Sequence, residues 1–469
     1  MKLSRILPPC AATLLFCCSC ALAVTPSSGK KDKKDLIDKK LPPQSSASQI
    51  KNPEDDLFNS REEILGPIQQ ASTATAAGSD WAEKIMSRVV INLPQGPLLL
   101  LPVVDSSRDT GPNYGIMPIW ALRDEKRQAI SSVIVPSVNY NQYFHTTYTY
   151  RHYFFPDDKQ LWFARGSYST VMQRELFLKY FNPEVAGTRY RVNAEARHWI
   201  NGKASYYGMG PDSTEAEKAT YALDLTGEEF TVGFPLPKNC FFEFTHSFYS
   251  YKVMNGPINN IPSLEQNFPT VYNSAINRKS FLNTKLALQY DGTDHPVIPK
   301  IGTFASAAAT FSKRGVGSDY SYTAYTLETK EYYNYKEEGK AVTALHAVYQ
   351  YQHGDAVPFY ALPVLGESTG LRAVGDGRYV DNGKLALSIE ERFTITRLPV
   401  LKFFTELEVA PFIDAGTVFS DNDDIRMKEM KIAYGAAFRI VIRPQVVAAA
   451  DFAYGKEGSN IIIHVGYPF

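Results

Sequence analysis

The stretch "RYRVNAEARHW", Arg189 to Trp199, alternates between two kinds of side chain. In an extended chain, successive side chains point to opposite faces. One face then carries Tyr190, Val192, Ala194 and Ala196, and the other carries Arg191, Asn193, Glu195 and Arg197. A charged face opposite an apolar face is typical of a barrel wall between lipid and a wet interior. We therefore expect Arg191, Glu195 and Arg197 to line such an interior.

The same alternation recurs along the chain from about residue 90 onward, in runs separated by Gly, Pro, Asn and Asp. In "FEFTHSFYSY", Phe242 and Phe244 alternate with Glu243 and Thr245. A transmembrane strand uses about 9–11 residues, and lipid offers no partner for free backbone groups, so a spanning sheet must close. Residues 90–469 are therefore predicted to form an all-β fold, a closed antiparallel transmembrane β-barrel of about 16 strands; 14 or 18 strands also fit.

The chain ends on "IIIHVGYPF", Ile461 to Phe469. Alternation predicts a last strand with Tyr467 and Phe469 on the same face as Ile461. A terminal phenylalanine on an aromatic-rimmed strand is similar to the end of outer-membrane barrels. Tyr467 and Phe469 are therefore expected to mark the barrel seam and the C-terminal signal. A core strand of a soluble β-sandwich is the alternative reading of these residues alone.

The N-terminus has the pattern of a secretory signal peptide. Lys2 and Arg5 supply positive charge, an apolar run follows, and Ala21-Leu22-Ala23 is a small-residue cleavage site. We expect residues 1–23 to be removed. Four of the five cysteines lie in this segment, so the mature chain keeps Cys240 and no intramolecular disulfide is expected. Acylation of Cys20, as in a lipoprotein, is the alternative.

Residues 24–89 are rich in Lys, Asp, Ser and Pro. They read as a polar periplasmic linker with one or two short helices. The whole chain has 49 Lys and Arg against 49 Asp and Glu, which gives no basic surface for nucleic acid. The export signal and the strand pattern together predict a protein of the cell outer membrane, of the Gram-negative type.

One motif suggests catalysis. "GESTG", Gly366 to Gly370, matches the G-x-S-x-G nucleophile elbow with Ser368 at its centre. That elbow needs a helix directly after the serine, and the following "LRAVGDGRYVDNG" is too rich in glycine to form one. No histidine pair has metal-binding spacing. We therefore expect no catalytic residue, no metal and no cofactor, and a protein that is not an enzyme.

Four blocks near the C-terminus carry a family resemblance. They are "PVLGESTGLRAVGDGRYVDNGKLALSIEERF" (363–393), "VAPFIDAGTVF" (409–419), "AYGAAFRIVIRPQVVAAADFAYG" (433–455) and the terminal "HVGYPF". In this order they resemble the closing strands of the BamA/TamA superfamily, the bacterial surface antigen barrels. Weaker similarities upstream extend the resemblance over nearly all of the chain after residue 95.

The resemblance implies that the loop between the eleventh and twelfth strands folds back into the barrel. Its arginine would be Arg372, with Glu390 and Asp414 on the barrel wall as acidic partners. We call these three residues the latch. The loop hinge would be Gly370, Gly375 and Gly377. Two residues depart from the family motif, because Ala373 stands at the usual glycine and Val374 at its aromatic neighbour.

The resemblance also implies a non-enzymatic role in inserting or translocating proteins or lipids, through a seam between the first and last strands. Expected partners are outer-membrane lipids, client polypeptides and periplasmic proteins. The POTRA domains that receive clients in this family have no recognisable counterpart in residues 24–89. A passive or gated pore for small solutes is the alternative function.

Overall fold

A computed structural model describes residues 90–107, 110–124, 129–157, 159–295, 298–335, 340–400, 403–442 and 446–469. The chain divides into two units, residues 1–40 and 41–469, and every described residue belongs to the second. The expected signal peptide (1–23) and linker (24–89) lie outside the described residues. Within the described part, no helix combines the length and apolar character needed to cross a membrane.

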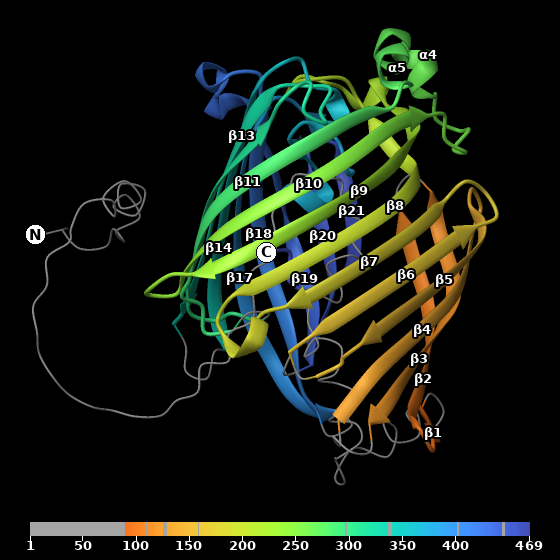
Figure 1. Cartoon of the computed structure of the whole chain (residues 1–469), viewed down its shortest axis with the longest axis vertical. Coiled ribbons are helices and arrows are strands. Elements are labelled where there is room, and N and C mark those ends of the chain that lie inside the picture. Colours follow the sequence, from red (N-terminus) through yellow and green to blue (C-terminus); the bar gives the residue numbers. More distant parts are fainter. Residues whose placement is uncertain are drawn as a thin grey trace, which may run out of the picture. The chain divides into compact units, whose positions relative to one another are not determined.

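The described residues form one large antiparallel sheet of 19 strands, which curves around an inner face (Figure 1). Each strand pairs with the next along the chain, apart from the step from β14 to β17. The strands are β1 (Val90–Leu93), β2 (Gly96–Ser107), β3 (Gly111–Asp124), β4 (Ala129–Asn141), β5 (His145–Phe154), β6 (Leu161–Ser169), β7 (Arg174–Asn182), β8 (Arg191–Tyr206), β9 (Ala219–Pro235), β10 (Cys240–Met254), β11 (Lys279–Asp291), β12 (Gly302–Ser312), β13 (Tyr322–Asn334), β14 (Ala341–Gly354), β17 (Gly383–Val400), β18 (Phe403–Phe419), β19 (Lys431–Ile442), β20 (Val446–Gly455) and β21 (Gly458–Val465).

The all-β prediction is confirmed, but about 16 strands is too few. Five strands, β17 to β21, follow the expected latch loop. This number agrees with the prediction, in which the twelfth to sixteenth strands follow the loop. The additional strands precede the loop. They fit because several connections are short: β4 ends at Asn141 and β5 begins at His145, and β6 ends at Ser169 and β7 begins at Arg174. The prediction of about 16 strands had assigned more residues to the loops between strands.

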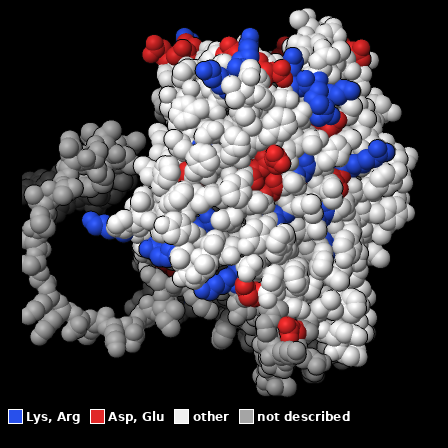
Figure 2. Space-filling view, in the orientation of Figure 1, with Lys and Arg blue, Asp and Glu red and all other residues white. Residues whose placement is uncertain are grey.

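The period of two residues separates the two faces of the sheet as the sequence indicates. On β8, Arg191 is buried on the inner face, whereas His198 is exposed on the outer face. Glu195 lies on the inner face with Arg191 and binds Lys179 of β7 at 2.9 Å. Exposed apolar side chains cover the outer face of many strands, among them Tyr148, Trp162, Leu176, Phe230, Leu288, Leu327, Ile413 and Phe438. Figure 2 shows that uncharged residues make up most of one such wall, with a small acidic group near its middle.

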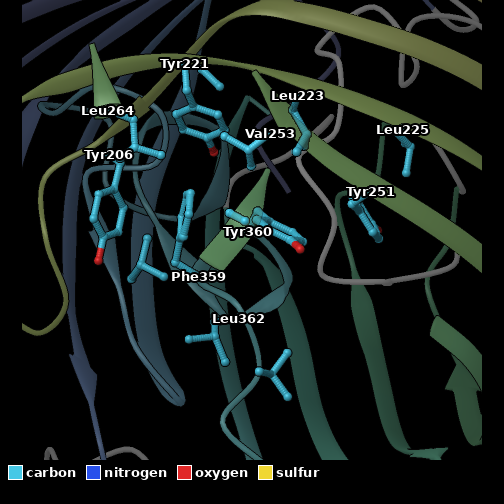
Figure 3. Packing of buried hydrophobic residues seen from close by; sticks show 14 of the residues in the cluster. Tyr206, Tyr221, Leu223, Leu225, Tyr251, Val253, Leu264, Phe359, Tyr360 and Leu362 are labelled. Atoms are coloured by element: carbon cyan, nitrogen blue, oxygen red, sulfur yellow. The ribbon is translucent and has the colours of Figure 1, made fainter. Parts of the chain in front are cut away.

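The loop between β14 and β17 packs against the inner face. It contains η5 (Phe359–Ala361), the two-residue strands β15 (Val364–Leu365) and β16 (Tyr379–Val380), and η6 (Glu367–Thr369). Phe359 and Tyr360 enter an aromatic cluster with Tyr206, Tyr221 and Tyr251 (Figure 3). Leu264 of α4 (Leu264–Asn267) belongs to the same cluster, and α5 (Pro269–Ala275) follows α4 at this end of the sheet.

The last strand ends earlier than the sequence suggests. β21 ends at Val465, and Gly466 follows with φ +96°, a left-handed conformation that glycine adopts readily. The chain turns at this residue, so Tyr467 and Phe469 do not continue the strand face of Ile461, which is exposed. Instead, Tyr467 packs beside Val441 and Val447, and Phe469 beside Tyr332. The predicted common face of Ile461, Tyr467 and Phe469 is therefore wrong.

The first strands are arranged unusually at the sheet edge. Leu98 and Leu99 of β2 pair with β1 and also with β3. Since a strand residue has one neighbour on each side, β1 must lie on the edge of β2 that faces away from β3. β1 therefore covers Gly96 to Leu99 of that edge, and the rest of β2, Leu100 to Ser107, has no partner strand on that side among the described residues.

Phe359→Ala tests the aromatic cluster. Phe359 is buried, and its ring centroid lies 4.4 Å from that of Tyr206 and 5.3 Å from that of Tyr221. Because its removal leaves a cavity, we expect the free energy of unfolding to fall by about 3–5 kcal/mol, measured by thermal or denaturant unfolding of the refolded protein. Val316→Ala, in an exposed turn, is the control and should change it by less than about 0.5 kcal/mol. Equal effects of both variants would contradict the packing role.

Candidate functional site

Arg372 lies on the inner face and contacts three carboxylates. Its Nε and Nη2 donate to the two oxygens of Asp414 at 2.8 and 2.6 Å. Its Nη1 donates to Glu390 at 2.6 Å and to Asp451 at 3.0 Å. The guanidinium also lies 3.4 Å from the centre of the Phe412 ring. The structure therefore brings together all three residues of the expected latch and adds Asp451 to them.

The charges around Arg372 decide its protonation. Burial alone would lower the pKa of Arg372, but its hydrogen bonds to Asp414 and the charges of Asp414, Glu390 and Asp451 raise that pKa above its ordinary value. The guanidinium therefore stays charged, and its Asp414 contact is bidentate, a geometry that a lysine could not reproduce.

The backbone around Arg372 explains how the loop turns toward the wall. Gly370 has φ +116° and ends η6 in a left-handed conformation. Gly377 also has positive φ, at +71°, whereas no positive φ is recorded for Gly375. Two of the three expected hinge glycines therefore use the freedom of glycine.

Ala373 stands where the family has a glycine, and its methyl group fits because the residue opposite it on the wall, Gly455, has no side chain. A Cβ built on Gly455 of β20 would lie 2.9 Å from the Cβ of Ala373. Ala373 is 1% exposed, so its methyl group fills the space that Gly455 leaves. A glycine on the barrel wall thus leaves the space that the alanine in the loop requires.

Two further arginines extend the charge cluster. Arg439 of β19 donates to Glu390 at 2.7 and 3.1 Å and to Glu408 at 3.1 Å. Arg392 of β17 donates from its Nε to Glu390 at 3.0 Å. Glu390 is fully buried and binds Arg372, Arg392 and Arg439 together. It is therefore the central carboxylate of the cluster.

The C-terminal residues pack on the same cluster. The Tyr467 hydroxyl donates to Glu408 at 2.9 Å, and the Arg392 guanidinium lies 3.9 Å from the centre of the Tyr467 ring. The Phe469 ring stacks on His346 at a centroid distance of 4.9 Å. The two outer nitrogens of Arg392 have no hydrogen-bond partner among the described residues, and the rings of Tyr467, Phe469 and Tyr332 lie over this guanidinium.

A second arginine holds the loop at another point. Arg378 donates to Glu457, in the turn between β20 and β21, at 2.6 and 2.8 Å. It also donates to the backbone carbonyl of Ser213, in the β8–β9 connection, at 2.6 Å. Tyr379 adds a hydrogen bond to Glu457 at 2.9 Å. The loop is thus bound to two separate parts of the barrel wall, the β20–β21 turn and the β8–β9 connection.

Ser368, the centre of the elbow-like motif, has a local structural contact. Its hydroxyl donates to Asp376 Oδ1 at 2.7 Å, and its backbone N–H donates to the same oxygen at 3.0 Å. η6 around it has three residues, Glu367–Thr369, and no longer helix follows.

Sequence reasoning missed Asp451, Arg439, Arg392, Glu408, Arg378 and Glu457. The sequence did contain a signal for Asp451 and Arg439. Each is the single charged residue in a strand-like run of uncharged residues, "AAADFAYG" and "AAFRIVI". Such isolated charges on a strand indicate an inner-face position. Their partners depend on the register between neighbouring strands, which one sequence does not reveal.

Comparisons with known proteins concern the family and the fold of the chain. The Omp85 superfamily domain matches residues 160–461. A solved structure of BamA from Haemophilus ducreyi, lacking POTRA domains 1–3, is similar over 86% of this chain and 80% of that chain, with 14% identity and a TM-score of 0.51. CdiB from Escherichia coli is similar over 80% of this chain and 63% of that chain, with 11% identity and a TM-score of 0.44. The search of curated proteins found no match.

The BamA likeness, at this identity, concerns the fold alone. The family match spans more than half of the chain and contains the latch, the arginine cluster and the first half of β21. It confirms the resemblance to the BamA/TamA superfamily and indicates a protein of the Gram-negative outer membrane. The chain belongs to the Omp85 superfamily of outer-membrane β-barrels.

Proposed function

We propose that this protein is a non-enzymatic component that inserts or translocates polypeptides or lipids at the outer membrane. In this proposal, the barrel closes through a weak seam between β2 and β21, and the seam opens to admit a client. Family membership supports the general role. The single observation that supports a weak seam is that the facing edges of β2 and β21 are both short.

Both edges of the seam are short. β1 already pairs with Gly96 to Leu99 of β2, on the edge that would face β21. β21 has eight residues, and it pairs only with β20 among the described strands. The free part of β2 and the whole of β21 are the template that an incoming strand could extend by backbone hydrogen bonds. Since β2 and β21 do not pair with each other among the described strands, no ladder of backbone hydrogen bonds between them would have to break for the seam to open.

The loop and the C-terminal tail would keep the barrel shut at rest. The aromatic cluster and the latch place the β14–β17 loop across the interior, and Tyr467 ties the end of β21 to Glu408 on β18. The region matched by the family model covers β6 to β20 and part of β21, and no POTRA domain lies in it. Client delivery is therefore assigned in this proposal to a periplasmic partner protein.

The proposed function has no catalytic step. Ser368 is held by Asp376 in a short turn, which leaves its hydroxyl without a neighbouring base of the elbow type. The buried charges of the latch and of the arginine cluster are paired with each other and would serve to position the loop.

Depletion of the protein tests the proposed function. We expect a subset of outer-membrane proteins or lipids to fall in abundance, because an inserted or translocated client cannot reach the membrane without its barrel. Quantitative proteomics and lipid analysis of outer-membrane fractions measure this. Complementation with the unchanged gene should restore the profile, and an unchanged profile after depletion would contradict the insertion role.

Arg372→Ala tests the latch and separates the two candidate functions. Removing one member of a buried charge group leaves the carboxylates uncompensated, at a cost of about 3–5 kcal/mol. We expect a protein that is closed in planar bilayers to open in this variant. Arg426→Ala is the control, because Arg426 pairs with Glu429 in an exposed turn and such pairs contribute about 0–1 kcal/mol. Large, steady openings of the unchanged protein would instead favour a solute pore lined by Arg191, Glu195 and Arg197.

Tyr467→Ala tests the C-terminal contact. It removes both the ring over Arg392 and the hydrogen bond to Glu408, so we expect lower thermal stability and more frequent channel openings. Tyr467→Phe keeps the ring and removes only the hydroxyl, so its destabilisation should be near 1 kcal/mol, the usual net contribution of a hydrogen bond. If both variants behaved like the unchanged protein, the tail would have no part in closing the seam.

A further inference from the structure

A hollow lies in the inner wall between β10 and β14, away from the latch. It has a volume of about 70 Å³. It forms because β12 and β13 contribute small side chains at this level, Thr310, Ala324 and Thr326. In the sheet register, Lys285 of β11 pairs with Thr310, Thr310 with Ala324, and Ala324 with Gln352 of β14. Two long polar side chains therefore flank a row of short ones.

Three side chains that line this hollow, Lys285, Gln352 and Asn283, offer hydrogen-bond donors. Lys285 is 8% exposed and makes no hydrogen bond or ion pair within 4.0 Å among the described residues; the carboxylate on which its charge acts is Glu243. Gln352 is 5% exposed, and its Nε2 has no hydrogen-bond partner in the described part of the chain. Asn283 accepts from Tyr322 through its Oδ1 at 2.8 Å, which leaves its amide nitrogen available to donate.

One wall of the hollow is aromatic. Tyr249, Tyr251 and Phe281 line it and belong to the aromatic cluster. Figure 3 shows Tyr251 and Tyr360 within that cluster. An aromatic wall excludes water, so a charge placed beside Lys285 would interact with it more strongly than in solution. An unpaired buried donor such as Gln352 Nε2 is costly unless a ligand accepts from it.

We propose that this hollow binds a small monoanionic group, a carboxylate or a phosphodiester, with Lys285 supplying the charge and Gln352 and Asn283 the hydrogen bonds. The size agrees, because one water needs about 10–15 Å³ by the same measure, and 70 Å³ then holds about five heavy atoms. Glu229 also lines the hollow, and its Oε2 accepts from the Tyr249 hydroxyl at 3.2 Å. Its negative charge opposes every anion, and a dianion about twice as strongly as a monoanion, so we restrict the proposal to a monoanion.

This site does not depend on the proposed function, since it would bind in a barrel that neither inserts clients nor conducts solutes. The same chemistry could come from a free small anion or from the phosphodiester of a lipid headgroup. Both sources offer two acceptor oxygens and one negative charge to the same donors.

Titration calorimetry of the purified, refolded full chain with dimethyl phosphate and with acetate tests the site. We expect saturable binding to the unchanged protein, binding at least tenfold weaker in Lys285→Met, and weaker binding in Gln352→Leu. Lys252→Met is the matched control, because Lys252 lies on the outer face of β10, and it should bind as the unchanged protein does. Absence of binding to the unchanged protein, or equal binding by Lys285→Met, would overturn the proposal.

Two further measurements cover folding and the source of the anion. If Lys285→Met does not refold, Lys285→Arg should retain binding because it keeps the charge, and its failure to bind while folded would count against the site. Native mass spectrometry then measures phospholipid retained by each variant. Loss of retained phospholipid in Lys285→Met, together with loss of anion binding, supports a lipid headgroup. Unchanged retention with lost anion binding supports a free small anion.

Discussion

The fold around the latch depends on one arrangement of buried charge. Three arginines, Arg372, Arg392 and Arg439, share four carboxylates, Glu390, Glu408, Asp414 and Asp451, on the inner face. Each of these charges would be costly alone in a dehydrated interior, and their mutual contacts offset that cost only when the full set is present. The loop supplies one arginine and the wall supplies the rest, so the wall is complete only with the loop in place.

Shared carboxylates join parts of the chain that are far apart in sequence. Glu390 binds an arginine of the loop and an arginine of β19, and that second arginine also binds Glu408, which accepts the hydroxyl of Tyr467. A change at the tail therefore alters the surroundings of the loop through three intermediate side chains, Glu408, Arg439 and Glu390. Contacts that share partners are not additive, so loop release and tail release are expected to be coupled in free energy.

Much of this could be read from the sequence. Alternation identified the strands and separated inner from outer side chains, as in Arg191 against His198. The family motif identified Arg372, Glu390 and Asp414, which the structure brings into contact. The number of strands was underestimated because turn lengths are not encoded in alternation. The inward turn after Val465 was missed because a single glycine, Gly466, ends the strand without disturbing the alternation of apolar residues.

Tyr467 and Phe469 contribute to the interior although they lie beyond the last strand. The rings of Tyr467, Phe469 and Tyr332 lie 3.9, 5.4 and 5.6 Å from the Arg392 guanidinium, whose two outer nitrogens have no hydrogen-bond partner among the described residues. Arg392 is therefore stabilised on that side by aromatic faces rather than by hydrogen bonds. A substitution that keeps an aromatic ring at position 467 or 469 would preserve this contribution, whereas an aliphatic residue of similar size would remove it.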